Sequence, residues 1–310
     1  MRTVLIGFGD IAPKHLEVLN ALNCEIIGVF ARNHQKLLMK TRTYNLEKTY
    51  KSIDDISDED FDFFTILVSP ENNAEVLEKT LSFKKPTLIE KPVSFSSQRL
   101  GKLIETNQQY ASKVMVAVNR RFYSIFHSGL SFLKERDKKV DSVVIEAPER
   151  FSDINLPKFS EIVRKNWMFC NSIHCVDLIR FFCGNIKKIE VNSKPEKYIH
   201  SAIGTSEQGV EFTYISNWKS PGSWSVRLYA DDMKIVYDPL EKGTIINKYG
   251  KKEINPSAED VNFKPGFYNQ LSYFMNCVSN SLDFKWPSSN LIDHKNTLAL
   301  IEEIYKVKNP

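Results

Sequence analysis

Hydrophobic residues follow two different patterns along the chain, and the change comes near residue 119. Before it, short runs are apolar throughout, which is typical of parallel strands covered on both faces. Helical patterns separate these runs, at about 33–42, 72–83 and 97–107. The alternation predicts a doubly wound α/β domain, with strands at Val4–Ile6, Glu25–Phe30, Phe63–Val68, Pro86–Glu90 and Val114–Val118.

After Asn119 apolar and polar residues alternate with a period of two. Within 224–230, for example, Trp224, Val226 and Leu228 share one face, and similar stretches occur at 143–146, 186–191, 210–215, 234–237 and 244–248. This pattern predicts a large, open-faced, mostly antiparallel sheet. Helical patterns at 172–182 (ended by Gly184), 267–281 and 291–305 would flank it, giving an α+β domain.

We therefore expect a Rossmann-type domain over residues 1–118 and a substrate-binding and oligomerisation domain over 119–310. The last helix is expected to pack back on the first domain. No internal repeat or low-complexity linker separates the two parts.

The first sixteen residues carry the most informative motif. Val4-Leu5-Ile6 leads into Gly7-Phe8-Gly9-Asp10-Ile11-Ala12, and a helical pattern follows. The first glycine allows a tight turn, the second lets the backbone approach a pyrophosphate, and the small alanine lets the helix pack on the strand. The pyrophosphate would lie over the helix N-terminus, where free N–H groups favour negative charge. The motif predicts a dinucleotide site formed by Gly7, Gly9, Asp10, Ile11 and Ala12.

The end of the second strand indicates which dinucleotide binds. An NAD site usually places Asp or Glu there, to accept hydrogen bonds from the ribose 2′-OH. Here the residues are Ala31-Arg32-Asn33, so the carboxylate is replaced by a guanidinium able to bind a 2′-phosphate. We expect NADP to be preferred. The alternatives are NAD, or use of both, with Arg32 as an ordinary solvated residue.

Composition excludes several other classes of protein. The net charge of +4 comes from dispersed charges of both signs, with no basic stripe for nucleic acid. No apolar run is long enough to span a membrane, and a strand begins at the N-terminus, so we expect a cytoplasmic protein. Five cysteines without framework spacing indicate free thiols. Cys170, His174 and Cys175 cluster, but they lack the pattern of a zinc site, and we expect no metal.

The tripeptide Glu90-Lys91-Pro92 follows a predicted parallel strand, at the sheet edge where doubly wound proteins bind ligands. Proline restricts the backbone of the lysine before it. A lysine held there could bind a substrate hydroxyl and stabilise it as it becomes an alkoxide during hydride loss. The alternative is a surface lysine in a loop.

Four motifs together resemble the glucose–fructose oxidoreductase/inositol dehydrogenase (Gfo/Idh/MocA) family over essentially the whole chain. They are the glycine turn with His15, Glu90-Lys91-Pro92, Asn119-Arg120-Arg121-Phe122 and His174-Cys-Val-Asp177. The resemblance implies NAD(P)-dependent oxidation or reduction of a sugar, cyclitol or nucleotide sugar. It also implies a homodimer or homotetramer built on the C-terminal sheet, and it adds Ser69, Pro70, Glu90 and Lys91 to the cofactor site.

Within this resemblance His174 is the expected general base, because histidine can take a hydroxyl proton near neutral pH. Asp177, one helical turn later, would orient the ring or bind substrate, although a structural role is equally compatible with its position. Lys91, His174 and Asp177 are thus the predicted catalytic residues. The expected substrate contacts are Asn119, Arg120, Arg121, Arg164 and Asn171. The three arginines would bind the diphosphate of a nucleotide sugar; the alternative is that they are ordinary surface charges.

Three departures from the family pattern concern the substrate and turnover. Members commonly have Asp four residues before the histidine, where this chain has Cys170. Glu71 and Ala74 replace an Asn and a His near Pro70, and the usual glycine pair before the histidine helix is replaced by Trp167-Met-Phe-Cys-Asn171. The alternative function is therefore a non-catalytic NAD(P)-binding regulator on the same fold. Retention of Lys91 and His174 favours the enzyme.

Overall fold

The computed structural model describes residues 1–44, 46–57 and 61–307, and its chain divides into two compact units. The first unit consists of Met1–Asn119 and Phe267–Lys295, and the second of Arg120–Gly266 and Asn296–Pro310. The first boundary falls one residue after the expected one. The second differs from the expectation of a continuous domain over 119–310, of which residues 308–310 lie outside the described ranges.

A seven-stranded sheet, counted over the described residues, forms the centre of the first unit, in the order β15-β6-β5-β4-β1-β2-β3. All neighbouring strands are parallel except β15, which pairs antiparallel with β6. The doubly wound sheet predicted from the sequence is confirmed. Its strands are β1 (Arg2–Ile6), β2 (Glu25–Phe30), β3 (Thr49–Tyr50), β4 (Phe63–Ile66), β5 (Thr87–Glu90), β6 (Val114–Ala117) and β15 (Ser289–Asn290).

Helices cover this sheet because each presents an apolar stripe to it. Side-chain caps start two of them: Asn33 accepts from the Lys36 amide in α2, and Ser96 accepts from the Arg99 amide in α4. The helices of the first unit are α1 (Ala12–Ala21), α2 (His34–Thr43), α3 (Asn73–Leu81), α4 (Ser97–Thr106), α5 (Gln108–Ala111), α11 (Phe267–Ser279) and the first turn of α12 (Leu291–Ile304).

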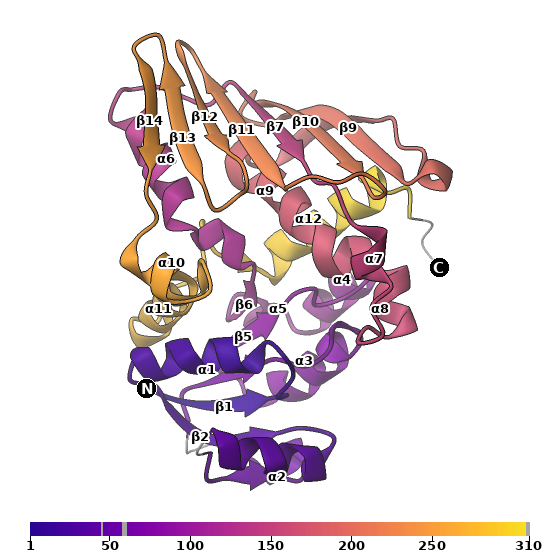
Figure 1. Ribbon diagram of the computed structural model, residues 1–310. Coiled ribbons are helices and arrows are strands. Elements are labelled where there is room, and N and C mark those ends of the chain that lie inside the picture. Colours follow the sequence, from indigo (N-terminus) through magenta and orange to yellow (C-terminus); the bar gives the residue numbers. More distant parts are fainter. Residues whose placement is uncertain (45, 58–60, 308–310) are drawn as a thin grey trace. The chain divides into compact units, whose positions relative to one another are not determined.

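Aromatic packing explains why the late segment Phe267–Lys295 belongs to the first unit. On α11, which lies beside α1 (Figure 1), Phe267 contacts the His15 ring at a centroid distance of 4.8 Å. Phe274 packs edge-on against Phe63 of β4 at 5.0 Å and stacks on Phe284 at 5.3 Å. The segment therefore completes the core of the first unit.

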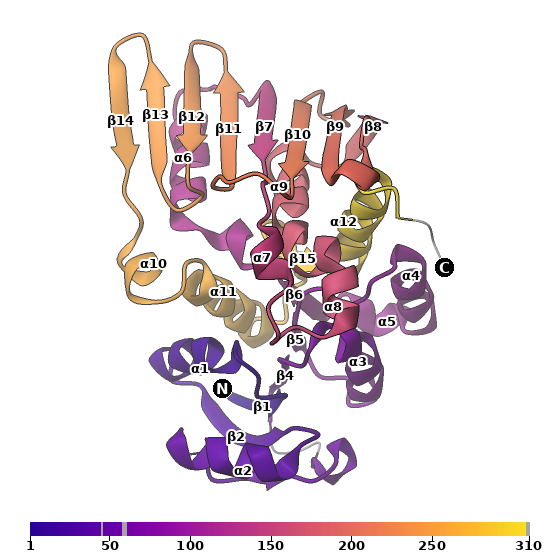
Figure 2. The ribbon, with the colours of Figure 1, turned by 45° about the vertical axis from the view of Figure 1, so that its right-hand side comes forward.

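An eight-stranded sheet, again counted over the described residues, forms the second unit, in the order β14-β13-β12-β11-β7-β10-β9-β8 (Figure 2). Only β7 and β10 pair parallel, so the mostly antiparallel sheet predicted from the sequence is confirmed. Its strands are β7 (Ser142–Glu146), β8 (Ile186–Val191), β9 (Ile199–Ser206), β10 (Glu211–Asn217), β11 (Ser225–Ala230), β12 (Met233–Tyr237), β13 (Gly243–Asn247) and β14 (Gly250–Ile254).

Helix α9 (Ile173–Cys183) packs on β7 and β10, and α6 (Ser124–Lys134) packs on β13 and β14. Every residue of α9 is buried, and Gly184 ends the helix with a φ of +86°. A π-helical turn, Met168–Ser172, leads directly into α9. The remaining helices of this unit are α7 (Phe151–Ile154), α8 (Glu161–Lys165), α10 (Ala258–Asn262) and the later turns of α12.

None of the helices in the described ranges combines the length and the apolar character needed to cross a membrane.

Candidate functional site

A hollow of about 680 Å³ lies in the first unit, at the carboxyl ends of β1, β2 and β4. The carboxyl edge of a parallel sheet is where doubly wound proteins bind ligands. Of the predicted cofactor residues, Gly7, Gly9, Asp10, Arg32 and Ser69 line this hollow. Ile11, Ala12, Pro70, Glu90 and Lys91 are not among its lining residues.

The glycine turn has the geometry that the sequence motif requires. Gly7 has a φ of +96°, and a Cβ there would come within 2.7 Å of the Leu67 backbone, so a side chain is excluded. A Cβ on Gly9 would meet nothing within 4 Å, which leaves the backbone open toward the hollow. Ile11 at the N-cap of α1 has no polar side chain to cap the helix. Pro13 has no N–H, and the N–H groups of Ala12 and Lys14 donate to the carbonyl oxygens of Gly9 and Ile11 at 3.3 and 3.0 Å. The open backbone at Gly9 and the positive end of the α1 dipole are therefore the features that suit an anion.

Three basic residues at four-residue spacing, Arg32, Lys36 and Lys40, line the same hollow. The last two are on α2, and Lys40 Nζ donates to the Phe8 carbonyl oxygen at 2.9 Å. Glu75 lines the hollow too, and the charge of Arg32 helps to lower its pKa, after the larger effect of a hydrogen bond from Lys79. The hollow therefore contains the charges of Lys36 and Lys40 in addition to the Arg32 guanidinium at the end of β2. These residues fit a dinucleotide that carries an additional phosphate.

Glu90 and Lys91 are held from several sides at the end of β5. His15 Nε2 lies 2.9 Å from Glu90 Oε1, and Asn73 Nδ2 donates to the carbonyl oxygens of Glu90 and Pro92 at 2.9 and 2.7 Å. His15 and Asn73 are fully buried. The backbone on both sides of Lys91 is consequently fixed, although the lysine itself is half-buried and does not line the hollow.

In the second unit His174 is the second residue of α9, immediately after the π-helical turn. It is buried, and its ring centroid lies 6.4 Å from that of Trp224. Arg120 places its guanidinium carbon 4.8 Å from the centroid of the same tryptophan ring. Trp224 Nε1 donates to the Pro148 carbonyl oxygen at 2.9 Å, which fixes the ring.

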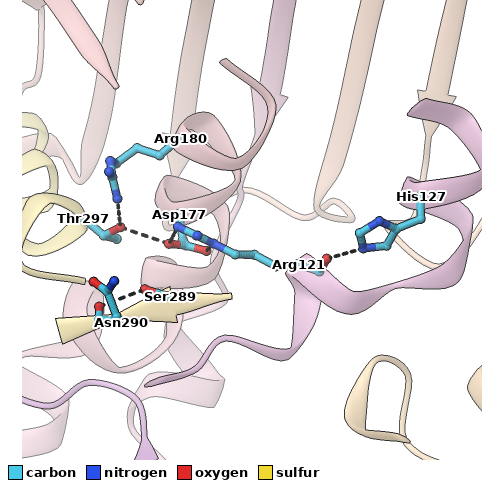
Figure 3. Close-up of polar contacts among 7 residues, drawn as sticks. All are labelled: Arg121, His127, Asp177, Arg180, Ser289, Asn290 and Thr297. Carbon is cyan, nitrogen blue, oxygen red and sulfur yellow. Dashed lines mark hydrogen bonds and ion pairs between the residues drawn. The ribbon is translucent and has the colours of Figure 1, made fainter. Parts of the chain in front are cut away.

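Asp177 and Arg121 bind each other in the core of the second unit (Figure 3). Arg121 Nε and Nη2 donate to the two carboxylate oxygens at 2.6 and 2.7 Å, and both side chains are at most 3% exposed. Thr297 Oγ1 donates to the same carboxylate at 2.9 Å and accepts from Arg180. The catalytic role predicted for Asp177 and the substrate contact predicted for Arg121 stay predictions, and this geometry favours a structural role for the pair.

The other predicted substrate residues lie in different surroundings. Asn119 is buried at the end of the first unit's continuous segment, and Arg164 is half-buried on α8. Asn171 lies in the π-helical turn, where its amide donates to the carboxylate of Glu149. Arg120, in contrast, lies against the Trp224 ring that His174 also faces.

The first 118 residues match a family model described as an oxidoreductase family with an NAD-binding Rossmann fold, GFO_IDH_MocA. The first domain is a Gfo/Idh/MocA domain. Over residues 1–118 the resemblance to this family is confirmed. No curated protein matches the chain.

Solved structures with the same fold extend beyond the Gfo/Idh/MocA domain over nearly the whole chain. UDP-N-acetylglucosamine 3-dehydrogenase from Acidithiobacillus ferrooxidans is 16% identical with a TM-score of 0.77, covering 98% of this chain and 96% of its own. Myo-inositol dehydrogenase from Corynebacterium glutamicum is 16% identical at 0.76, with 99% and 96% covered. An Agrobacterium radiobacter oxidoreductase in complex with NAD⁺, L-tartaric acid and magnesium is 15% identical at 0.77, with 99% and 95% covered. At these identities the likeness shows the fold alone.

Sequence reasoning missed several residues around the Gfo/Idh/MocA motifs. Lys36 and Lys40 could have been found, because they follow Arg32 at helical spacing in a stretch that is visibly basic. No local sequence pattern marks Asn73 or Glu149, because each forms its hydrogen bonds with a segment that is distant in the sequence. The five cysteines are buried free thiols, and burial raises the pKa of Cys175. Over the described ranges no group of three His, Cys, Asp or Glu side chains has metal-binding geometry.

Proposed function

We propose that the protein is an NADP-preferring oxidoreductase that transfers a hydride between nicotinamide and a hydroxyl or carbonyl carbon of a sugar, cyclitol or nucleotide sugar. One observation carries the proposal: the glycine turn and the basic residues Arg32, Lys36 and Lys40 line one hollow at the carboxyl edge of the sheet. A dinucleotide with a 2′-phosphate matches this arrangement of open backbone and positive charge.

Bound NADP would supply the hydride acceptor or donor; the remaining chemistry belongs to side chains. Lys91 would donate a hydrogen bond to the reacting oxygen of the substrate and stabilise the negative charge that develops there. His174 would take the proton of the same hydroxyl in oxidation and return it in reduction. Arg120, Arg164, Asn171 and Asn119 stay candidate substrate contacts. Arg120 is favoured for a phosphate-bearing substrate, because its guanidinium and the His174 ring both lie near the Trp224 ring.

Binding of the cofactor can be tested without knowing the substrate. Arg32→Ala should weaken NADPH binding about ten- to a hundred-fold, because hydrogen bonds to a charged group contribute about 1.5–3 kcal/mol. NADH binding should change less than about two-fold, since NADH lacks the 2′-phosphate. Both are measured by nicotinamide fluorescence titration. Arg99→Ala is the matched control: Arg99 also lies near Glu75 but does not line the hollow. Equal loss for both nucleotides, or no loss, would contradict the assignment.

Turnover is tested with NADP⁺ and NAD⁺ against a panel of UDP-N-acetylglucosamine, myo-inositol and simple aldoses, following nicotinamide absorbance. With the substrate found, Lys91→Met should lower kcat about 10²- to 10³-fold, as loss of a donor to a developing oxyanion does. Lys102→Ala, an exposed lysine of the same unit, should retain full activity. Tight NADPH binding with no turnover in the panel, and no effect of Lys91→Met on ligand affinity, would favour the non-catalytic regulator instead.

A further inference from the structure

Glu149 is a buried carboxyl group that none of the roles above uses. It follows β7 by three residues and is 5% exposed. Its backbone N–H donates to the Asn217 carbonyl oxygen at 3.0 Å, which fixes it to the end of β10. A buried carboxyl requires partners, because leaving it unsatisfied costs several kcal/mol.

Those partners lie in the segment that leads into His174. Ser172 Oγ donates to Glu149 Oε1 at 2.7 Å, and Asn171 Nδ2 lies 3.2 Å from Oε1 and 2.9 Å from Oε2. Both residues end the π-helical turn Met168–Ser172, and His174 follows two positions later. The carboxyl group therefore connects the end of the sheet to the start of α9.

A π-helical turn is rarely stable by itself, and such turns are frequent at functional sites. The turn in this protein consists of five residues and is followed directly by α9, in which every residue is buried. A change in the path of the turn would move the first residues of α9, because the turn continues directly into that helix. The contacts of Glu149 with Asn171 and Ser172, the last two residues of the turn, therefore hold His174 in its position.

The surroundings of Glu149 also extend to the Trp224 ring that faces His174. The charge of Arg120, whose guanidinium lies over that ring, acts on Glu149. Pro148, next to Glu149, accepts the hydrogen bond from Trp224 Nε1. Burial raises the pKa of Glu149, an effect only partly offset by Trp167, Ser172, Asn171 and Arg120. Glu149 also borders a hollow of about 500 Å³ that Arg150 and Lys219 line as well.

We propose that Glu149 is a positioning residue for His174: its carboxyl group holds the end of the π-helical turn and so fixes the imidazole for proton transfer. The inference rests on the proposed function, in which His174 carries the proton. It also gives Asn171 a different role from the substrate contact expected from the sequence, because the Asn171 amide is bound to Glu149.

The test observes the His174 ring directly and needs no substrate. The six histidines are labelled, and their ring Cε1–Hε1 cross-peaks are recorded by NMR in the full-length protein, with His174 assigned from His174→Gln. Glu149→Gln replaces one acceptor oxygen by an NH₂ group that cannot accept from Asn171. We expect the His174 cross-peak to move by more than its linewidth. The His15 and His34 cross-peaks, from the first unit, should stay in place.

Asp260 provides the matched control. It is another buried carboxyl of the second unit, and it accepts hydrogen bonds from the N–H and hydroxyl of Ser124 on α6. Its charge acts on His127 of the same helix. Asp260→Asn should therefore move the His127 cross-peak and leave that of His174 unchanged. This pattern separates positioning of His174 from a general loss of stability.

An unchanged His174 cross-peak in Glu149→Gln would overturn the inference, even if the variant melted at a lower temperature. If Glu149→Gln does not fold, Ser172→Ala decides, because it removes the 2.7 Å contact and retains the carboxyl group. A His174 cross-peak that does not move in Ser172→Ala would then overturn the proposal.

Kinetics add a second readout once a substrate is known. Glu149→Gln should lower kcat about ten- to a hundred-fold and change KM less than about two-fold, because a small misplacement of a reacting group has effects of this size. Failure to find turnover would contradict the proposed function, whereas the NMR result would still decide the role of Glu149. A fall in kcat/KM due to KM alone would contradict positioning.

Discussion

At the scale of single residues, burial determines the protonation of His200. It is 4% exposed on β9, with its ring against Tyr305 at 4.2 Å and Trp218 at 5.3 Å. Burial lowers the pKa of His200 from its ordinary 6.5 to about 4. The folded protein therefore binds the proton only near pH 4, whereas the unfolded chain binds it near pH 6.5.

The free energy of unfolding should consequently fall as the pH decreases from about 6.5 to about 4, by about 3 kcal/mol from this residue. His200→Phe should remove that part of the pH dependence. Urea unfolding is followed by tryptophan fluorescence in a Trp286→Phe background, in which the remaining tryptophans (Trp167, Trp218 and Trp224) all belong to the second unit. His34→Gln, in the first unit, should keep the slope of the wild type. The same slope in His200→Phe would contradict the assignment.

The sequence could locate only those candidate residues whose surroundings are formed by their neighbours in the chain. Gly7, Gly9 and Arg32 line one hollow, and a motif could bring them together because a turn and a strand end are local features. Their role in binding a cofactor stays a prediction. Arg121 and Asp177 form an ion pair although they are 56 positions apart. The residues next to each of them in the sequence do not indicate whether it is buried in this pair or exposed in a substrate site. Glu149 was missed for the same reason, since its partners are 22 and 23 positions away.

At the scale of elements, α11 stabilises the first unit through one aromatic residue. Phe274 is fully buried between Phe63 and Phe284. Phe274→Ala should lower the free energy of unfolding of this unit by about 3–5 kcal/mol, the usual cost of removing a buried phenylalanine ring. Urea unfolding followed by circular dichroism measures the change. Asn276→Ala, exposed on the same helix, should cost less than about 0.5 kcal/mol. Equal, small effects of both variants would place α11 outside this core.

Elements with a strong period were predicted, and elements without one were not. The apolar strands of the first sheet and the alternating strands of the second both appear in the structure. Helix α6 was missed because it contains Ser124, Ser128 and Gly129, which favour other structures. Packing favours Gly129, since a Cβ there would clash with the buried Tyr237 hydroxyl unless that ring moved. Strand β15 has only two residues and is fixed by pairing with β6, which no local pattern reveals.

At the scale of the whole molecule, the outer face of the second sheet predicts self-association. Ile203, Ile215 and Tyr229 are exposed there, at 52%, 37% and 37%. Ile203 pairs with Thr213, and Thr213 pairs with Val144, so uncharged side chains continue across three strands. The family resemblance implies a dimer or tetramer through this sheet, and an exposed, partly apolar face of this kind suits a second copy of the chain.

Ile203→Lys combined with Ile215→Lys should convert the assembly to monomers, because two charges would be buried at each copy of the interface. Size-exclusion chromatography with light scattering measures the mass. Leu282→Lys, an exposed apolar residue of the first unit, should leave the mass unchanged. A wild-type protein that is already monomeric at the highest concentration tested would contradict self-association through this face.

The return of Phe267–Lys295 to the first unit has a consequence for synthesis of the protein on the ribosome. The glycine turn and six strands of the first sheet emerge early, but β15 and α11 emerge only after Arg120–Gly266 has been made. At about 5–20 residues per second this takes roughly 7 to 30 seconds. During that time the apolar surface around Phe63 stays uncovered, because Phe274 has not yet been made. The first unit, although its synthesis starts first, is therefore accessible to chaperones and proteases for the longest time.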